Sequence, residues 1–288
     1  MRRDRRILFV HAHPDDESIN NGATMAHYAS AGAHVALVTC TLGEEGEILV
    51  SGLAGLAADQ ADQLGGWRIA ELSSAMAALG VADHRFLGGA GRFRDSGMLG
   101  TPPNEHPRAF WRAASDPAVF AAAVAELVAV ISDIRPQVLV TYDEHGGYGH
   151  PDHVMAHRIA MAAVADADWK VAKVYCNAVP ASVAAELVSV SAGQQNPFSP
   201  TPELPQIADE LVTTAVAAPA AWPAKRDALA AHATQVTVRD EWYALSNDLG
   251  LPISATEYYR LVQGRVGGER DANGRETDLF GGLGDLDA

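Results

Sequence analysis

The chain has 288 residues and a formal net charge of −15 at pH 7, with 36 Asp and Glu against 21 Lys and Arg. This acidity argues against nucleic acid and anionic membranes as partners, since both attract basic surfaces. The length allows one large domain or two modest ones. We expect neither a membrane span nor a signal peptide, because no apolar run looks long enough. Cys40 and Cys176 are expected to be reduced core thiols of a cytoplasmic protein.

The first predicted strand is the apolar run at residues 7–10, and the next eight residues read His-Ala-His-Pro-Asp-Asp-Glu-Ser. So many ionisable groups at one turn need compensation for their desolvation. A divalent metal supplies it, because imidazole and carboxylate are preferred metal ligands. His13 and Asp16 are three residues apart and would share one side of a helical first turn. We therefore predict that His13 and Asp16 bind a metal and that Asp15 stays free for chemistry.

Helices and strands alternate after this motif. Helices are expected at 21–31, at about 53–79 with an interruption at Gly65-Gly66, at 119–134 and at 151–165, and strands at 34–41, 85–87, 137–142 and 170–176. This alternation predicts an α/β fold with a doubly wound, Rossmann-like, mostly parallel sheet and helices on both faces. The glycine- and proline-rich loop at 88–107 is too long for a simple connection and indicates part of a binding site.

The pattern weakens after residue 180, where a smaller mixed region is expected. Its elements are strands at 207–216 and 257–262 and a helix at 222–232, with a linker at 196–205 and a loosely ordered tail from about residue 264. We therefore predict a Rossmann-like catalytic domain with the metal site at 1–176. The smaller region at 177–288 would complete the substrate cleft.

A second cluster, Gly-Gly-Tyr-Gly-His-Pro-Asp-His at 146–153, follows the fourth predicted strand. In a doubly wound sheet the first and fourth strands are neighbours, and ligands bind outside their carboxyl ends. The two clusters should therefore meet although they are far apart in the sequence. We predict His153 as the third metal ligand, while His150 and Asp152 are left to act beside the metal.

Simpler interpretations exist for single residues. His11 alone is best explained as a hydrogen-bonded core residue. Asp15 or Asp16 alone could cap the helix that follows. The glutamates within 44–47 fit a solvated loop about as well as a substrate role.

Other classes of protein share parts of the pattern. The metallo-β-lactamase motif is similar to His-x-His-x-Asp-Asp, but it ends in His and belongs to a two-metal sandwich fold. An Fe(II) oxygenase could use two His and one carboxylate, but it would not need a spare carboxylate and a spare imidazole. A non-catalytic, zinc-stabilised sugar- or nucleotide-binding domain is the third alternative. Structural zinc takes four protein ligands, the chain offers three strong ones, and no Gly-x-Gly-x-x-Gly follows the first strand.

His-Pro-Asp-Asp-Glu at 13–17, together with His-Pro-Asp-His at 150–153, resembles the LmbE-like zinc N-deacetylases, which act on N-acetylglucosaminyl compounds. Further similar stretches lie at 39–47, 88–92, 94–98, 231–236 and 276–279. Within the family they are most similar to the branch that removes acetate from N-acetylglucosaminyl-inositol in mycothiol biosynthesis. Mycothiol S-conjugate amidases share both clusters, but Ile19 and Gly149 stand where they usually carry Lys and Pro. An amidase or another LmbE-like deacetylase is the alternative function.

The resemblance implies a cytoplasmic, metal-dependent hydrolase acting on a small-molecule glycoside. It implies one Zn²⁺ per chain, or Fe²⁺ in its place, held by His13, Asp16 and His153. It also implies that Arg68 and Asp95 bind the sugar and inositol hydroxyls. Neither a nucleic acid nor a membrane is expected as a partner, and a homo-oligomer stays open.

For the reaction we expect Asp15 to accept a proton from the attacking water. His150 is expected to stabilise the oxyanion, and Asp152 to keep His150 cationic, since a carboxylate raises the pKa of an imidazole. Tyr148 would assist the oxyanion or serve packing. Whether Asp15 or His150 protonates the leaving amine stays open.

Overall fold

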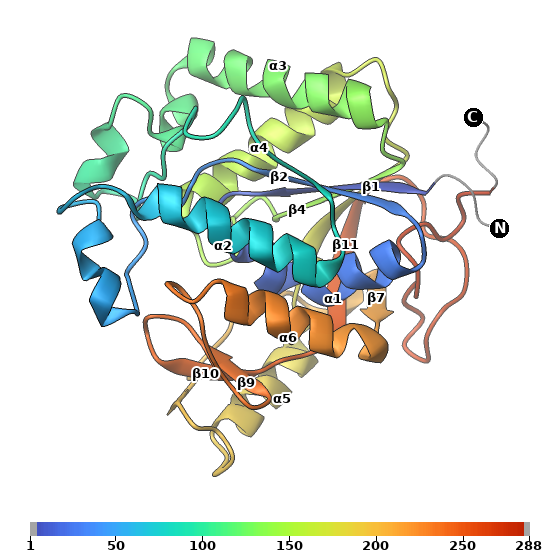
Figure 1. Ribbon diagram of the computed structural model, residues 1–288. Coiled ribbons are helices and arrows are strands. Elements are labelled where there is room, and N and C mark those ends of the chain that lie inside the picture. The colour runs from blue at the N-terminus through green and yellow to red at the C-terminus, as the bar shows by residue number, and fades with distance from the viewer. Residues whose placement is uncertain (1–4, 285–288) are drawn as a thin grey trace.

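Seven strands form the main sheet of the computed structural model, which describes residues 5–284 (Figure 1). Their order is β3-β2-β1-β4-β5-β11-β7. The strands are β1 (Arg6–His11), β2 (His34–Thr39), β3 (Asp83–Phe86), β4 (Val138–Thr141), β5 (Lys173–Ala178), β7 (Thr214–Ala217) and β11 (Thr256–Gln263). Strands β1 to β5 run parallel, whereas β11 runs antiparallel to both β5 and β7. The predicted doubly wound sheet is confirmed, and its order reverses between β1 and β4.

Helices cover both faces of this sheet (Figure 1). They are α1 (Asp16–Ser30), α2 (Leu64–Leu79) and α6 (Trp222–Ala231) on one face, and α3 (Pro117–Ile134) and α4 (Pro151–Asp166) on the other. Successive side chains of a strand point to opposite faces, so Ile7 and Phe9 of β1 pack with α1, α2 and α6, whereas Leu8 and Val10 pack with α3 and α4. Burial on both faces explains why β1 is apolar throughout.

Helix α3 corrects the expectation that no apolar run of the chain is long enough to span a membrane. Its 18 residues, with a mean hydropathy of 1.9, are long and apolar enough to cross a bilayer by length and composition. It is the one such helix among residues 5–284. Its Leu127 and Ile131 are buried in the same hydrophobic cluster as Leu8 and Val10 of the sheet.

Helix α2 starts later than its sequence pattern predicts. Residues Ser51–Leu56 form a separate 3₁₀ helix, and Gly65-Gly66 lies in the first turn of α2 instead of interrupting it. A Cβ on Gly65 would lie 2.8 Å from Cγ of Glu44 and 2.9 Å from Cβ of Leu42. Glycine is therefore required here because the helix meets the preceding loop closely, and it does not end the helix.

The C-terminal region joins the main sheet through β7 and β11 and adds a second sheet of four strands in the order β6-β10-β9-β8. These are β6 (Ser199–Pro200), β8 (Thr237–Arg239), β9 (Trp242–Ala244) and β10 (Leu249–Pro252), with α5 (Ala181–Ser191) beside them. Of the strand expected at 207–216, only its end forms, as β7. Because β11 pairs with β5, hydrogen bonds cross the expected boundary at residue 176. The division into two domains stays a prediction.

The segment after Gly264 packs against the sheet, contrary to the expected loose tail. Glu276 is fully buried, and its carboxylate lies 2.6 Å from Nζ of Lys173. The hydroxyls of Tyr175 and Thr214 donate hydrogen bonds to the same carboxylate, each at 2.8 Å. The last residues of the expected tail, 285–288, lie outside the described residues.

Candidate metal centre

Both histidine-rich motifs lie at the same edge of the main sheet. The first follows β1 and the second follows β4 by a short loop, and these two strands pair directly. The rings of His13 and His153 are 5.3 Å apart between centroids, and Nε2 of His153 lies 3.4 Å from Oδ1 of Asp16. The expected meeting of the two clusters is therefore confirmed.

His13, Asp16 and His153 present their donor atoms to one another inside the protein. Nδ1 of His13 lies 3.3 Å from Oδ2 of Asp16, and all three side chains are buried. Within the described part of the chain, Nε2 of His153 has no hydrogen-bond partner. Buried polar atoms are normally paired, so this nitrogen is available for a metal. The separations of 3.3 and 3.4 Å from Asp16 to the two histidines are compatible with ligands that share one ion, since metal–ligand bonds are about 2 Å long, and the set of three stays a prediction.

His13 is shared by two groups of side chains that could hold an ion. Their donor atoms lie within 4.8 Å of one another, and the groups are His13, His150 and His153, and His13, Asp95 and Asp152. Several carboxylates and imidazoles thus meet at one buried place, where a divalent cation would neutralise the excess of acidic groups. The chain has a metal-binding group of histidines and aspartates around His13.

Asp152 faces His13 instead of His150. Its Oδ2 lies 3.4 Å from Nε2 of His13 and accepts a hydrogen bond from the backbone N–H of Ser96 at 2.9 Å. The opposite nitrogen of His13 faces Asp16, so His13 lies between two carboxylates. A carboxylate behind a metal-binding histidine fixes its tautomer and orientation. The expectation that Asp152 keeps His150 cationic is wrong.

His150 is the N-cap of α4, and its Nδ1 accepts a hydrogen bond from the backbone N–H of Asp152 at 3.2 Å. A ring nitrogen that accepts carries no proton, so the neutral ring has its proton on Nε2. Burial, together with the nearby His13 and His153, lowers the pKa of His150 to about 3. His150 is thus arranged as a neutral donor.

Asp15 does not cap the helix that it precedes. Its carboxylate makes no capping hydrogen bond, and its backbone has φ 112° and ψ −32°, which is unusual for a residue other than glycine. Nη2 of Arg68 donates to Oδ2 of Asp15 at 3.0 Å and also to the carbonyl of Pro14. Burial raises the pKa of Asp15 and Arg68 lowers it, with a net value of about 6. The side chain is 15% exposed and can be reached from solvent.

Arg68 and Asp95 both lie beside this group. Nη1 of Arg68 donates to the carbonyl of Gly43 at 2.7 Å, and its Nε has no partner within residues 5–284. Oδ1 of Asp95 lies 3.5 Å from Nε2 of His13 and accepts from the N–H of Gly97. Despite burial, His13 and His150 hold the pKa of Asp95 well below its usual value. Their substrate-binding roles stay predictions.

His11 and Glu44 are both buried and hydrogen-bonded beside the metal group. Nε2 of His11 is hydrogen-bonded to Oδ1 of Asn21 at 2.8 Å, which confirms His11 as a core residue. Glu44 is buried, and its Oε2 accepts from the N–H of Asp95 at 3.0 Å. Glu44 therefore supports the loop that carries Asp95.

Sequence reasoning missed Tyr142. Its hydroxyl donates to Oδ2 of Asp16 at 2.7 Å, and its ring stacks on His153 with 4.1 Å between centroids. The sequence signal that could have found Tyr142 is its position directly after β4, because ligands of a doubly wound sheet bind outside the carboxyl ends of its strands. Tyr148, in contrast, is 61% exposed and meets His153 edge-on at 5.1 Å, so its catalytic role stays a prediction.

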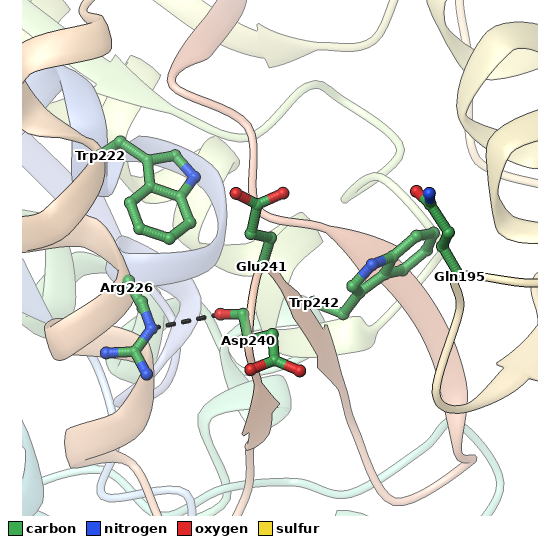
Figure 2. A pocket seen from close by; sticks show the side chains of 6 residues that line it. All are labelled: Gln195, Trp222, Arg226, Asp240, Glu241 and Trp242. Carbon is green, nitrogen blue, oxygen red and sulfur yellow. Dashed lines mark hydrogen bonds between the residues drawn. The ribbon is translucent and has the colours of Figure 1, made fainter.

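A separate cavity of about 470 Å³ lies in the C-terminal region (Figure 2). It is lined by Gln195, Trp222, Arg226, Asp240, Glu241 and Trp242. Nε1 of Trp222 already donates to the carbonyl of Ile253, and Trp242 is only 8% exposed. None of the six residues belongs to the metal group, so this cavity does not support a zinc-stabilised sugar-binding domain.

Comparison with known proteins gives the family. The PIG-L family model, described as GlcNAc-PI de-N-acetylase, matches residues 8–164. A 1D-myo-inositol 2-acetamido-2-deoxy-alpha-D-glucopyranoside deacetylase of Geodermatophilus obscurus is 56% identical over 98% of this chain and 99% of its own length.

Solved structures are similar at low identity. The 4-carboxy-2-hydroxymuconate hydratase GalB of Pseudomonas putida has a TM-score of 0.57 at 16% identity and covers 93% of this chain and 100% of its own. The zinc-inhibited form of a teicoplanin deacetylase has a TM-score of 0.55 at 18% identity, over 89% of this chain and 97% of its own. These two show the fold alone. On the family match and the full-length relative, the chain belongs to the PIG-L family of de-N-acetylases, the LmbE-like family that its motifs resemble.

Proposed function

We propose that this chain is a metal-dependent hydrolase that removes the acetyl group from N-acetylglucosaminyl-inositol. The products are glucosaminyl-inositol and acetate, a step of mycothiol biosynthesis. The relative from Geodermatophilus obscurus bears the name of this activity and is 56% identical over nearly the whole chain. The observation that carries the proposal is that Asp15 directly precedes Asp16 of the metal group, yet its partly exposed carboxylate is held by Arg68 and not by a histidine.

The proposed cofactor is one Zn²⁺ per chain, with Fe²⁺ as the alternative ion. His13, Asp16 and His153 would hold it, which leaves a coordination position open for substrate or water. When bound, the ion polarises a carbonyl oxygen and lowers the pKa of water toward about 7. We place the enzyme in the cytoplasm, in keeping with its free thiols at Cys40 and Cys176.

Asp15 is the proposed general base. It takes a proton from water as the water oxygen bonds to the acetyl carbon, and a carboxylate with a pKa of about 6 suits this task near neutral pH. Arg68 holds one of its oxygens. When the C–N bond breaks, its electron pair goes to nitrogen, and Asp15 returns the proton to the amine. Burial and the nearby His13 and His153 lower the pKa of His150 and keep it neutral, which favours Asp15 over His150 for this second transfer.

His150 is the proposed donor to the oxyanion. Its Nε2 lies 4.0 Å from Oδ1 of Asp95, and the other nitrogen of the ring is held by the first turn of α4. Such a donor contributes about 3 kcal/mol to transition-state stabilisation. Tyr148, exposed beside His150 with 6.1 Å between ring centroids, is proposed to assist. Arg68 and Asp95 are proposed to bind the hydroxyls of the glycoside.

Acetate release from N-acetylglucosaminyl-inositol tests this function directly. We expect release by the purified protein, its loss after chelation, and its recovery on adding one equivalent of Zn²⁺ or, without oxygen, Fe²⁺. The ion that restores the higher rate is the better cofactor. A mycothiol S-conjugate serves as the second substrate, and faster cleavage of the conjugate would replace the deacetylase with the amidase. No hydrolysis of either substrate by metal-loaded protein would refute both.

A further inference from the structure

The backbone at Asp15 needs support. A residue other than glycine at φ 112° is strained, and such strain persists only where the surrounding structure enforces it. One support comes from Arg68 on α2, through the carbonyl of Pro14 and the carboxylate of Asp15. The other comes from Glu17, whose Oε2 accepts the backbone N–H of Asp15 at 3.0 Å.

The carboxylate of Glu17 is in turn bound by His232 of the C-terminal region. Its Oε1 lies 2.7 Å from Nε2 of His232, and neither side chain is exposed to solvent. His232 is the C-cap of α6. Within the similar stretch at 231–236, Thr234 also donates from its N–H and hydroxyl to Glu71 of α2, at 2.9 and 2.7 Å. This stretch therefore contacts both elements that support Asp15.

We propose that His232 is a positioning residue for the general base. His232 orients Glu17, Glu17 holds the strained peptide of Asp15, and the carboxylate of Asp15 is thereby fixed where it must accept the proton. The inference rests on the proposed function, since it assumes that Asp15 is the base. It assigns a role to a side chain that is distant from the motif in sequence and that acts through its contact with Glu17.

The same helix supplies a matched control. Lys225 of α6 lies 2.7 Å from Oε1 of Glu257 and donates to the carbonyl of Ile19 on α1 at 3.0 Å. This pair is buried and also joins α6 to α1, but it does not contact Asp15 or Glu17. A purely structural role for His232 predicts equal effects at both pairs, whereas a positioning role predicts different ones.

The experiment compares His232→Leu, His232→Gln and Lys225→Met in zinc-loaded protein. Zinc content, thermal unfolding, kcat and KM are measured for each. We expect His232→Leu to keep its zinc and its KM and to lose about 10- to 100-fold in kcat, because small misplacements of a catalytic group are costly. His232→Gln keeps a donor for Glu17 and should recover most of the rate. Lys225→Met should lower the melting temperature and keep kcat.

A second measurement decides the matter if His232→Leu does not fold. Glu17→Gln keeps the shape but cannot accept from both His232 and Asp15, so it should lose kcat as His232→Leu would. In an Asp15→Ala background, Glu17→Gln should lower kcat no further, because its effect passes through Asp15. Equal losses in both backgrounds, or an unchanged kcat in folded Glu17→Gln, would overturn the inference. Full activity of Asp15→Ala would instead refute Asp15 as the general base, whereas failure of the unmutated protein to release acetate would refute the proposed function itself.

Discussion

Asp15 and Asp16 are neighbours in the sequence with opposite surroundings. Asp16 accepts hydrogen bonds from the N–H of His13 and the hydroxyl of Tyr142 and faces His153. Burial alone would raise the pKa of Asp16, but His153 and His13 hold it well below the usual value. Among residues 5–284, the hydrogen bond to the carboxylate of Asp15 comes from the guanidinium of Arg68. Asp16 thus stays ionised as a ligand would, and Asp15 can exchange a proton.

The first prediction separates these two aspartates. Asp16→Ala should lose metal and activity together, because a ligand is removed. Asp15→Ala should keep its metal and lose about 10²- to 10⁴-fold in turnover, the usual cost of removing a general base. Metal analysis beside acetate-release kinetics on both variants checks this. Metal-free Asp15→Ala beside fully loaded Asp16→Ala would reverse the assignment.

Tyr142 is predicted to control metal affinity. Tyr142→Phe keeps the ring that stacks on His153 and removes the hydroxyl that donates to Asp16. Loss of a partner that holds a ligand typically weakens metal binding about 10- to 100-fold. Competition with a chromophoric chelator measures this affinity. Tyr28→Phe, which removes a buried hydroxyl bonded to Asp278, is the control and should bind metal as the wild type does. Equal affinities in all three proteins would contradict the prediction.

At the scale of elements, sequence patterns predicted which helices and strands exist better than where they begin. Helix α1 starts at Asp16, inside the first motif, and not near residue 21. The acidic residues of this motif carry no apolar periodicity, so the pattern could not show that the helix had begun. The two glycines of α2 misled in the same way, because a glycine that permits close packing and a glycine that ends a helix look alike in a sequence.

Those two glycines give a prediction with its own control. A methyl group on Gly65 would collide with Leu42 and Glu44, whereas nothing lies within 4 Å of the position on Gly66. Gly65→Ala should therefore push α2 from the loop, cost about 1–3 kcal/mol of stability, and lower kcat by moving Arg68. Gly66→Ala should be neutral or stabilise the protein by about 0.5–1 kcal/mol. Denaturant unfolding and kinetics of both variants check this, and equal stabilities would show that α2 has room to spare.

At the scale of the whole molecule, sequence reasoning succeeded where a general rule links elements. The doubly wound rule placed β1 beside β4 and so brought His13 to His153. No such rule pairs β11 with β5 or brings His232 to Glu17, because these contacts join the alternating part of the chain to the C-terminal region, where the alternation of strands and helices stops. Their partners are selected by the packing of the complete fold.

The segment after Gly264 is the clearest example of contacts that the sequence pattern does not predict, and it gives the last prediction. Glu276 anchors this segment to the main sheet through three buried side chains, Lys173 and Tyr175 of β5 and Thr214 of β7. Glu276→Ala should cost about 3–5 kcal/mol in unfolding free energy, because the charge of Lys173 then stays buried without an opposite charge.

Denaturant unfolding measures this cost, and two further variants interpret it. Lys173→Met combined with Glu276→Leu removes both charges and should recover much of the loss, since apolar replacement of a buried ion pair is often close to neutral. Arg270→Ala, on the exposed part of the same tail, should change stability by less than about 0.5 kcal/mol. Wild-type stability in Glu276→Ala would mean that the tail is not anchored by this pair. Zinc content should stay unchanged throughout, because none of these side chains contacts the metal group.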